Sequence, residues 1–339
     1  MHTDYHFSIL KGTLQMQKLS NQEKWHPLKG VLLNFAALLL LITVGRYLGN
    51  TFGLWGIMMY ETMFCLLAVG YTLIQKTPLK EVFPIHIPTL RHAGASILMW
   101  IGAGLLGFLS IYLAYVIFPN IFISTASGIS KALTNGSPLL SIVVTSIFAP
   151  ICEESLERGA VFSHFRGLKR EWVAVLIIGL FFGIMHTDPI RFMNTAIMGA
   201  TFAYIMVKTN NILIPVSLHF MSNFGASILS LINQKNISTD EAMDMLQTIS
   251  PQRLLGAAMM LFFAGPLIMT LGIQLFRPKI AKDAPLEERR ERQKKCQREL
   301  IIATCISCAI MLIGAILMVT DPQFKEALAQ SQKIINSNS

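Results

Sequence analysis

Charged residues are scarce in this sequence of 339 residues. Only 14% of the residues are charged, 53% are hydrophobic, and the mean hydropathy is +0.53. A soluble globular protein carries about 25% charged residues, so this composition excludes that class. A chain this apolar does not remain solvated as a disordered chain, and 23 Gly and 14 Pro are too few for a collagen-like or low-complexity protein. The sequence is therefore that of a membrane protein.

Cysteine is scarce as well. The five cysteines are odd in number and scattered over apolar or basic segments, which is not the pattern of a secreted disulfide framework. Cys305 and Cys308 have Cys-x-x-Cys spacing, but no second pair and no nearby histidine accompany them, so zinc or redox chemistry is not favoured. A His-Glu-x-x-His signature is also missing. We expect no bound metal and no cofactor.

Two further features are missing from the sequence. The first apolar run begins only after residue 30 and has no small-residue cleavage site behind it, so we expect no cleavable signal peptide and a first span that stays as an anchor. No internal repeat is visible, which disfavours a transporter built from two related halves.

Nine apolar stretches approach the length of about 20 residues that a helix needs to cross a bilayer. They cover 31–49, 54–75, 95–118, 138–160, 172–187, 191–208, 211–232, 253–276 and 300–320. The fifth and sixth are short, the fourth contains charged residues and the seventh contains a histidine. We predict an all-α, polytopic transmembrane helix bundle of eight or nine spans, with the active site inside the bundle.

Positively charged residues indicate the orientation of this bundle. With the N-terminus in the cytoplasm, 21 of the 28 lysines and arginines fall on the cytoplasmic side, nine of them between Arg277 and Arg298. The net charge of +9 therefore indicates topology in the cell membrane and not a nucleic-acid partner. We interpret 277–299 as a solvated cytoplasmic helix; a binding site for anionic lipid or for a partner is the alternative.

Ionisable and polar residues inside the predicted spans are costly and usually mark a functional interior. They occur in three places here, as Glu153, Glu154 and Arg158 in the fourth span, Phe182 and His186 at the end of the fifth, and His219 and Asn223 in the seventh. The other six histidines, for which we expect solvated side chains and no role, are His2, His6, His26, His86, His92 and His164.

Helical spacing gives these residues partners. Glu154 and Arg158 share a helix face, so the guanidinium can hold the Glu154 carboxylate ionised. Glu153 points about 100° away from Glu154 and is free to face a different partner. Phe182 precedes His186 by one turn, where its ring could support the imidazole. His219 and Asn223 also share a face, and two hydrogen-bonding groups one turn apart are suited to binding a single oxygen atom.

Together these groups provide the components of water-mediated hydrolysis. Glu153, in a low-dielectric setting, can act as a general base toward water, and His186 can share that water or pass a proton to a leaving amine. His219 and Asn223 can donate hydrogen bonds to the oxyanion of a tetrahedral intermediate. No serine or cysteine nucleophile is needed, and we interpret Cys152 as a packing residue.

Taken in order, Glu-Glu-x-x-x-Arg, Phe-x-x-x-His and His-x-x-x-Asn resemble the CPBP family of CAAX-type proteases and bacteriocin-processing proteins, also called Abi, which includes the type II CAAX prenyl endopeptidase. The resemblance covers about 138–232. It implies an intramembrane glutamate-dependent endopeptidase in which Glu153 and His186 activate water and His219 and Asn223 form the oxyanion hole. It also implies that Glu154 and Arg158 support the site, and that the catalytic cavity opens to the cytoplasm.

One position departs from the family pattern. Where the family usually has a bulky apolar residue before the arginine, this sequence has Glu157. Facing the site, Glu157 would place a third carboxylate near Glu153 or compete for Arg158; facing the cytoplasmic interface, it would be solvated. We favour the solvated position.

The predicted organisation is a cytoplasmic segment (1–30), N-terminal transmembrane helices (31–137), a catalytic core (138–232), C-terminal transmembrane helices (233–320) and a polar tail (321–339). The predicted substrate is a membrane-associated peptide or protein, and the sequence leaves open whether it is prenylated and what the oligomeric state is. Two alternatives stay open, namely a metal-dependent membrane protease and a non-catalytic scaffold, immunity or regulatory protein whose motif residues form a structural polar network.

Overall fold

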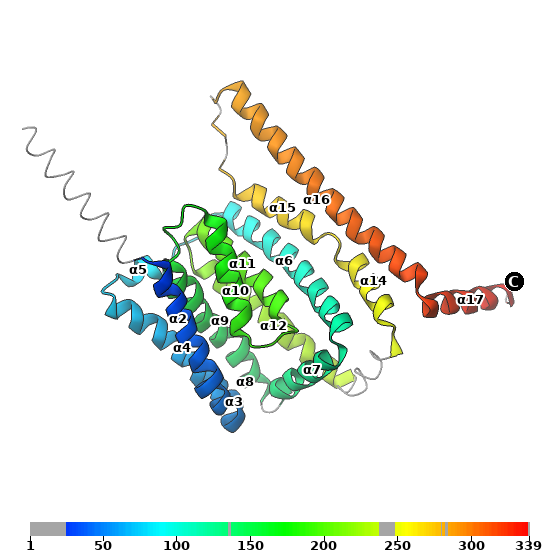
Figure 1. Cartoon of the computed structure of the whole chain (residues 1–339), viewed down its shortest axis with the longest axis horizontal. Helices are drawn as coiled ribbons and strands as arrows, with labels where there is room; N and C mark the ends of the chain where they lie inside the picture. Colours follow the sequence, from blue (N-terminus) through cyan, green and yellow to red (C-terminus); the bar gives the residue numbers. More distant parts are fainter. Residues whose placement is uncertain (1–24, 135–136, 237–247, 279, 282–283, 338–339) are drawn as a thin grey trace, which may run out of the picture.

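The structure is a bundle of helices (Figure 1). This computed structural model describes residues 25–134, 137–236, 248–278, 280–281 and 284–337. Within those ranges all regular secondary structure is helical, which confirms the predicted all-α class. Seven helices are long and apolar enough to cross a membrane: Pro27–Phe52, Leu54–Ile74, Leu90–Ile117, Pro138–Val161, Leu213–Ile232, Pro251–Phe276 and Leu286–Thr320. The protein is therefore a multi-pass membrane protein.

Two of the nine predicted stretches form shorter or more polar helices that are not among these seven. The fifth corresponds to α10 (Glu171–Met185), whose 15 residues rise only about 22 Å. The sixth corresponds to α11 (Phe192–Thr209), which includes Asn194 and Lys208 and is less apolar. The two helices pack against each other in the middle of the bundle, where other helices surround them (Figure 1).

The first and fourth spanning helices contain π-helical turns. The first consists of α2 (Pro27–Leu40), η1 (Leu41–Gly45) and α3 (Arg46–Phe52). The fourth consists of α8 (Pro138–Ile142), η2 (Val143–Phe148), α9 (Ala149–Glu154) and η3 (Ser155–Val161). Such turns rotate the residues that follow them and are frequent at functional sites. The fourth helix carries Glu153, Glu154 and Arg158 between and within its two π-helical turns.

The remaining helices surround this central part. They are α4 (Leu54–Ile74), α5 (Leu79–Val82), α6 (Leu90–Ile117), α7 (Pro119–Thr134), α12 (Leu213–Asn236), α14 (Pro251–Phe262), α15 (Gly265–Phe276), α16 (Leu286–Thr320) and α17 (Pro322–Ser337). Helix α16 begins in the basic segment and continues without a break through the last apolar stretch, so 286–299 and the predicted 300–320 span form one helix. In Figure 1 this helix runs alongside α14 and α15 at one side of the bundle.

Small residues bring α10 and α11 into close contact. A Cβ atom added to Gly179 of α10 would lie 2.7 Å from the Cβ atom of Ala200, and one added to Gly199 of α11 would lie 2.7 Å from the Cβ atom of Phe182. Close backbone approach through small residues is the common mode of helix packing in membranes. The close packing of α10 against α11 determines where Phe182 lies relative to the fourth helix, and also where His186 lies one turn later.

Apolar side chains cover both the interior and the outer surface. Leu33, Phe64, Leu156 and Ile178 belong to one buried cluster that joins α2, α4, η3 and α10. Large hydrophobic residues such as Leu66 are exposed, as expected for a surface that faces lipid and not water. Because apolar side chains occur both in the interior and on the outer surface, they do not identify the interior of the bundle. The contacts between polar side chains do.

The close approach of α10 and α11 leads to a test. We expect Gly179→Leu to lower the stability of the detergent-solubilised protein by about 1–3 kcal/mol, because the added side chain must push α11 away. Unfolding followed by circular dichroism in a denaturant series measures this. Gly104→Leu on α6 is the matched control, because a Cβ atom there meets nothing within 4 Å. Equal stability of the two variants would contradict the packing described.

His164 lies at the junction of α2, α4 and the fourth helix, and our prediction of a solvated side chain is wrong for this residue. It is 1% exposed, its Nε2 atom lies 3.0 Å from the hydroxyl of Tyr71, and its ring meets Trp25 edge-on. The spacing of polar residues along the chain gave no sign of this, because the covering residues come from α2 and α4. Burial, with the nearby charges of Lys29 and His26, lowers the pKa of His164 to about 4.

This lowered pKa predicts a pH dependence of stability. An unfolded histidine has a pKa of about 6.5, so between that value and the folded value the unfolded chain binds a proton that the folded chain does not. The contribution of His164 is therefore present above about pH 6.5 and is lost as the pH falls toward its folded pKa. We expect the free energy of unfolding to fall more steeply over this window in the wild type than in His164→Gln. The exposed His86, changed to Gln, should leave the wild-type slope unaltered.

Candidate active site

A cavity of about 380 Å³ lies between α4, the fourth spanning helix, the end of α10 and α12. Its polar lining consists of Tyr60, Glu61, Glu153, Glu157, His186, Arg191 and Asn223, together with Thr145 and Thr187. Three of the six predicted site residues, namely Glu153, His186 and Asn223, thus line one cavity. The other three, Glu154, Arg158 and His219, are buried and are not part of this lining.

Glu154 and Arg158 form the ion pair that their spacing predicts. The Arg158 Nε atom lies 3.1 Å from the Glu154 Oε2 atom, and both side chains are fully buried. The second carboxylate oxygen of Glu154 lies 2.9 Å from the Nδ1 atom of His219 on α12. Because a carboxylate only accepts hydrogen bonds, Nδ1 of His219 is the protonated donor in this pair. The pair thereby orients the imidazole ring.

The same guanidinium connects α10 and α11 to the fourth helix. Arg158 Nη2 donates to the carbonyl oxygen of Gly199 at 3.2 Å, which is on α11. The guanidinium carbon lies 4.3 Å from the ring centroid of Phe182 on α10, in a cation–π arrangement. Phe182 in turn contacts the rings of His186 and His219 edge-on, at 4.8 and 5.6 Å between centroids. One buried cation therefore organises the side chains that support both histidines.

His219 reaches toward the cavity with its second nitrogen. Its Nε2 atom lies 3.9 Å from the Glu153 Oε2 atom, too far for a direct hydrogen bond. With Nδ1 donating to Glu154, Nε2 can donate a hydrogen bond only when the ring is the doubly protonated imidazolium. In that form the charges of Glu153, Glu154, Arg158 and His219 sum to zero, which reduces the cost of burying them together.

His186 ends α10 and has a defined tautomer. Its Nδ1 atom lies 2.8 Å from the carbonyl oxygen of Phe182, and since a carbonyl only accepts, Nδ1 carries the proton. The Nε2 atom of the neutral ring is then a hydrogen-bond and proton acceptor. Phe182 holds His186 in two ways, through its backbone carbonyl and through its ring.

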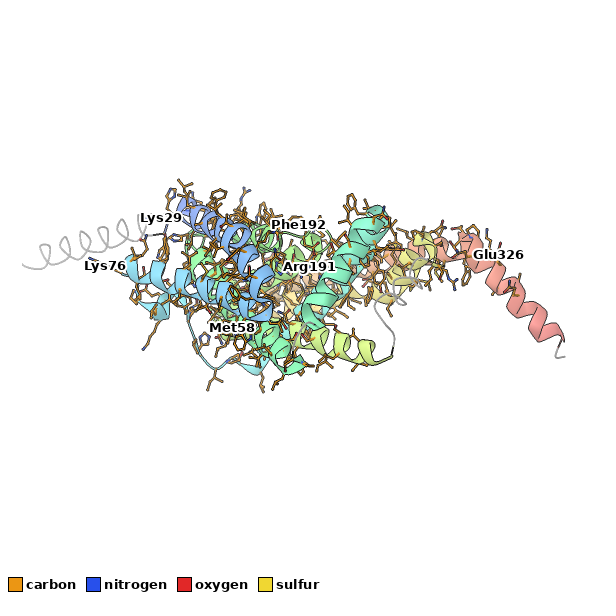
Figure 2. All side chains as sticks on the ribbon, turned by 90° about the horizontal axis from the view of Figure 1, so that it is seen from below. Lys29, Met58, Lys76, Arg191, Phe192 and Glu326 are labelled. Atoms are coloured by element: carbon orange, nitrogen blue, oxygen red, sulfur yellow. The ribbon has the colours of Figure 1, made fainter. Side chains whose placement is uncertain are left out.

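The chain turns sharply directly after His186. Thr187 has a φ of 49°, a left-handed conformation that is strained for a β-branched residue. Asp188 accepts hydrogen bonds from the backbone N–H of Ile190 and from Arg191 Nε, at 2.9 and 2.6 Å. The turn therefore directs Arg191 into the cavity lining, at the start of α11. Figure 2 labels Arg191 and Phe192 in the central part of the molecule.

Asn223 lies on α12 and donates from Nδ2 to the backbone carbonyl of Thr145 at 2.9 Å. Thr145 belongs to the π-helical turn η2. This hydrogen bond uses one of the two N–H groups of the amide, and the other is available to a group in the cavity. The π-helical turn and Asn223 thus place a fixed donor in the cavity wall.

Glu157 corrects our expectation that it faces a solvated interface. It is 2% exposed, lines the cavity, and accepts a hydrogen bond of 2.7 Å from Asn34 Nδ2 on α2. It does not take Arg158 from Glu154, whose ion pair is intact. The sequence pattern shows which face of a helix a residue occupies, but not which other helix covers that face.

Sequence reasoning missed two charged residues of the cavity, Glu61 and Arg191. Glu61 is the one charged residue of α4 and is 2% exposed. An isolated ionisable residue in an apolar span is a signal that could have identified it, because such residues usually face the bundle interior. Arg191 is the first residue of the sixth predicted stretch, where a charge at the end of a span is common, and it carried no comparable signal.

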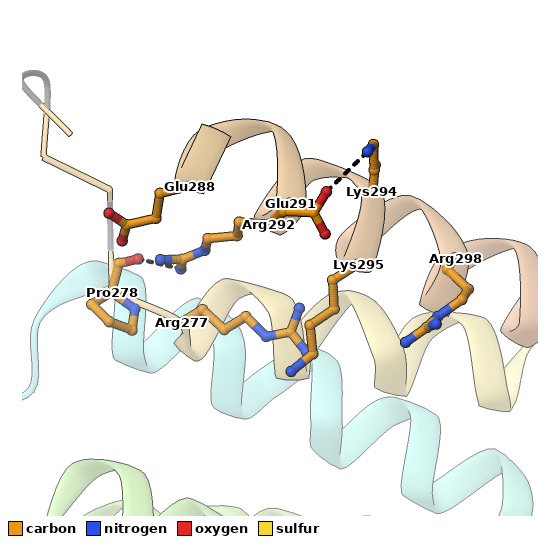
Figure 3. A pocket seen from close by; sticks show the side chains of 8 residues that line it. All are labelled: Arg277, Pro278, Glu288, Glu291, Arg292, Lys294, Lys295 and Arg298. Carbon is orange, nitrogen blue, oxygen red and sulfur yellow. Dashed lines mark hydrogen bonds and ion pairs between the residues drawn. The ribbon is translucent and has the colours of Figure 1, made fainter. Parts of the chain in front are cut away.

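A larger cavity, of about 740 Å³, lies elsewhere, between the end of α15 and the start of α16 (Figure 3). Its lining is mostly basic and contains none of the predicted site residues. Part of this charge is already paired, since Arg277 Nη2 lies 2.6 Å from Glu299 Oε2 and Lys294 Nζ lies 2.9 Å from Glu291 Oε1. These pairs suit a charged, water-exposed end of α16.

Among the residues that the structure describes, no group of three or more His, Cys, Asp or Glu side chains is placed to hold a metal ion. Cys305 and Cys308 are both exposed on α16. Cys152 is buried beside the cavity wall, as expected for a packing residue.

Comparison with known proteins points to the same part of the chain. Residues 135–225 match the family described as type II CAAX prenyl endopeptidase Rce1-like. Over 106 residues the chain is 32% identical to the protein named "Putative membrane peptidase YdiL" from Bacillus subtilis (strain 168), which corresponds to 31% of this chain and 43% of that relative. The match thus spans less than half of the length of the curated relative. No solved structure matches this chain.

The matched segment contains all three polar motifs, from Glu153 to Asn223, and these supply the polar network and much of the cavity lining described above. Over this segment the chain is similar to the Rce1-like type II CAAX prenyl endopeptidases.

Proposed function

We propose that this chain is an intramembrane endopeptidase that hydrolyses a peptide bond of a membrane-associated peptide or protein, with Glu153 and His186 activating the attacking water. The observation that carries this proposal is the shared cavity, in which a carboxylate, an imidazole with a free acceptor nitrogen and an amide donor face one buried space. The similarity of residues 135–225 to the Rce1-like family supports it as well. No side-chain nucleophile is required.

In the proposed reaction, Glu153 takes a proton from water as the water oxygen attacks the carbonyl carbon. The carbonyl oxygen becomes an oxyanion that accepts hydrogen bonds from Asn223 and from the imidazolium Nε2 of His219. The C–N bond then breaks, and the proton taken from water passes to the leaving amine, directly from Glu153 or through His186 Nε2. The products are a carboxylic acid and an amine, so one water is consumed for each bond cleaved.

Glu154 and Arg158 have a supporting role in this scheme. Glu154 accepts a hydrogen bond from the Nδ1–H group of His219. It thereby stabilises the imidazolium form, whose Nε2–H group donates to the oxyanion in this scheme. The positive charge of Arg158 balances the negative charge of Glu154. The guanidinium also contacts the ring of Phe182, which in turn contacts the rings of both histidines. Neither residue lines the cavity, so neither needs to contact the substrate.

The proposed topology places the N-terminus in the cytoplasm of a cell-membrane protein. With α10 and α11 counted beside the seven longer helices, the described residues form nine membrane segments, and 20 of the 28 lysines and arginines would lie on the cytoplasmic side once Arg158, buried within a span, is left out of the predicted 21. We propose that the cavity opens toward that side. Short peptide precursors or other membrane proteins, prenylated or not, are the candidate substrates.

The proposal is tested by Glu153→Gln, which removes the base but preserves size and insertion. We expect peptide processing to fall by about 100-fold or more, because general-base catalysis contributes factors of this order. Comparison of the membrane and secreted peptidomes of cells with the wild type and with Glu153→Gln would reveal the precursor that accumulates. His186→Gln should give the same pattern.

The matched control is Glu326→Gln, an acid-to-amide change on α17, well apart from the central helices in Figure 2. It should process peptides as the wild type does. Membrane insertion and thermal stability of all three variants, followed in parallel, separate lost chemistry from lost folding. Unchanged processing by Glu153→Gln would refute the proposed function.

A metal-dependent protease is the alternative that chelation tests. Because our scheme uses only protein groups and water, we expect processing by the purified protein to survive exhaustive treatment with a chelator. Elemental analysis of the same sample gives a second measurement. Loss of activity on chelation, with recovery on adding zinc, would favour the metal-dependent mechanism instead.

A non-catalytic scaffold is the second candidate, and one observation favours it. The ion pair of Glu154 with Arg158, the hydrogen bond from His219 to Glu154 and the hydrogen bond from Arg158 to the carbonyl of Gly199 join three helices, as a structural polar network would. For a scaffold, however, the carboxylate and imidazole facing the cavity would have no use. Identical peptidomes for the wild type and Glu153→Gln would support this candidate.

A further inference from the structure

Glu61 is a buried carboxyl group beside the proposed base. It lies in α4, outside the segment that matches the family, and lines the cavity that also contains Glu153. Its carboxyl group and that of Glu153 line the same cavity and are close enough to interact electrostatically. Only 2% of the residue is exposed. A single acidic residue in an apolar helix is costly unless a partner inside the bundle accounts for it.

The proximity of these two buried carboxyl groups favours one proton between them. Glu61 Oε2 and Glu153 Oε2 are both shielded from solvent, and neither accepts a hydrogen bond from an N–H or O–H donor within the described part of the chain. Two ionised carboxylates are acceptors only and cannot bond to each other. At about 4 Å, two like charges would repel by about 4 kcal/mol at an effective dielectric constant of 20. One shared proton converts this repulsion into a hydrogen bond.

The neighbouring cations are already engaged. Arg158 is paired with Glu154, and Arg191, which also lines the cavity, is paired with Asp188 at 2.6 Å. The remaining acid of the cavity, Glu157, accepts its hydrogen bond from Asn34 and not from a cation. No ion pair to Glu61 occurs among the described residues. A neutral Glu61 needs none.

We propose that Glu61 is protonated in the folded protein and donates a hydrogen bond to the Glu153 carboxylate, which makes Glu61 a positioning residue for the base. This inference rests on the proposed function, because Glu153 is the base only in that scheme. With one oxygen of Glu153 held by Glu61, the other is left to accept a hydrogen bond from the attacking water. Glu61 keeps its own proton through the cycle, so the bond making and bond breaking described above are unchanged.

Infrared spectroscopy tests the proton itself without any substrate. A protonated carboxylic acid has a C=O stretching band that a carboxylate lacks, and the band shifts in heavy water. We expect the difference spectrum of wild type minus Glu61→Gln, at neutral pH, to contain one such band. A band from any other buried acid, such as Glu157, would be present in both proteins and cancel. A difference spectrum without it would overturn the proposal.

Two substitutions test the positioning role. Glu61→Gln keeps an N–H donor toward Glu153, so we expect the processing rate to stay within about fivefold of the wild type. Glu61→Leu fills a similar volume without a donor, and we expect kcat to fall by about 10- to 100-fold with little change in KM, as for other groups that orient a reacting residue. The substrate is the precursor that accumulates in Glu153→Gln membranes, and Glu326→Gln is the control.

The pH profile distinguishes positioning from simple packing. In the wild type, loss of the Glu61 proton at alkaline pH would break the hydrogen bond to Glu153, so Glu61→Gln, which has no such proton to lose, should lack this part of the alkaline fall in kcat. A packing role would leave the alkaline fall unchanged in Glu61→Gln. Wild-type kcat for Glu61→Leu would overturn the positioning role.

Failure of this inference can be told apart from failure of the proposed function. If Glu153→Gln processes peptides normally, the proposed function is wrong, and the infrared band still decides whether Glu61 is protonated. If Glu153→Gln is inactive while Glu61→Leu matches the wild type in rate and pH profile, the proposed function stands and the role of Glu61 is refuted. Thermal stability of both Glu61 variants shows whether either is merely misfolded.

Discussion

The buried guanidinium of Arg158 constrains four helical segments at once. A charge inside a helix bundle is tolerated only where partners replace the lost water, and breaking such a buried pair costs several kcal/mol. Arg158 obtains these partners from Glu154 on its own helix, from the carbonyl of Gly199 on α11 and from the ring of Phe182 on α10. Glu154 extends the set to His219 on α12. The positions of both histidines therefore depend on one cation that does not line the cavity.

The π-helical turns of the fourth helix complement this arrangement. In an uninterrupted α-helix the N–H of Ala149 would donate to the carbonyl of Thr145, whereas in the π-helical turn η2 it donates to the carbonyl of Val144. Pro150, the π-helical partner of Thr145, has no N–H, so the Thr145 carbonyl is left to accept a hydrogen bond from Asn223 Nδ2. The second turn, η3, contains Glu157 and Arg158, whose side chains reach α2 on one side and α11 on the other. The side chains and carbonyl groups of this one helix therefore contact α2, α11 and α12, which lie on different sides of it.

Local spacing was sufficient to predict contacts within a helix, but not the contacts between helices or the environment of each residue. The pairs one turn apart, Glu154 with Arg158 and Phe182 with His186, are formed as predicted. The errors concern covering by distant helices: α2 brings Asn34 over Glu157, and α2 with α4 buries His164. Hydropathy likewise predicted apolar stretches at α10 and α11, but it did not show that these shorter helices lie in the middle of the bundle (Figure 1).

The role of the N-terminal helices follows from the same reasoning. The family match begins at residue 135, yet part of the cavity wall, including Tyr60 and Glu61, belongs to α4, and the partner of Glu157 belongs to α2. Without these helices Glu157 would lose the hydrogen bond from Asn34, and Glu153 would lose the part of the cavity wall that α4 provides. An ionised carboxylate without such surroundings is costly inside a membrane. The matched segment contributes the motifs, but the low-dielectric pocket in which their charges can be balanced requires α2 and α4 as well. The candidate site, with the helices that enclose it, therefore extends beyond the segment that similarity identifies.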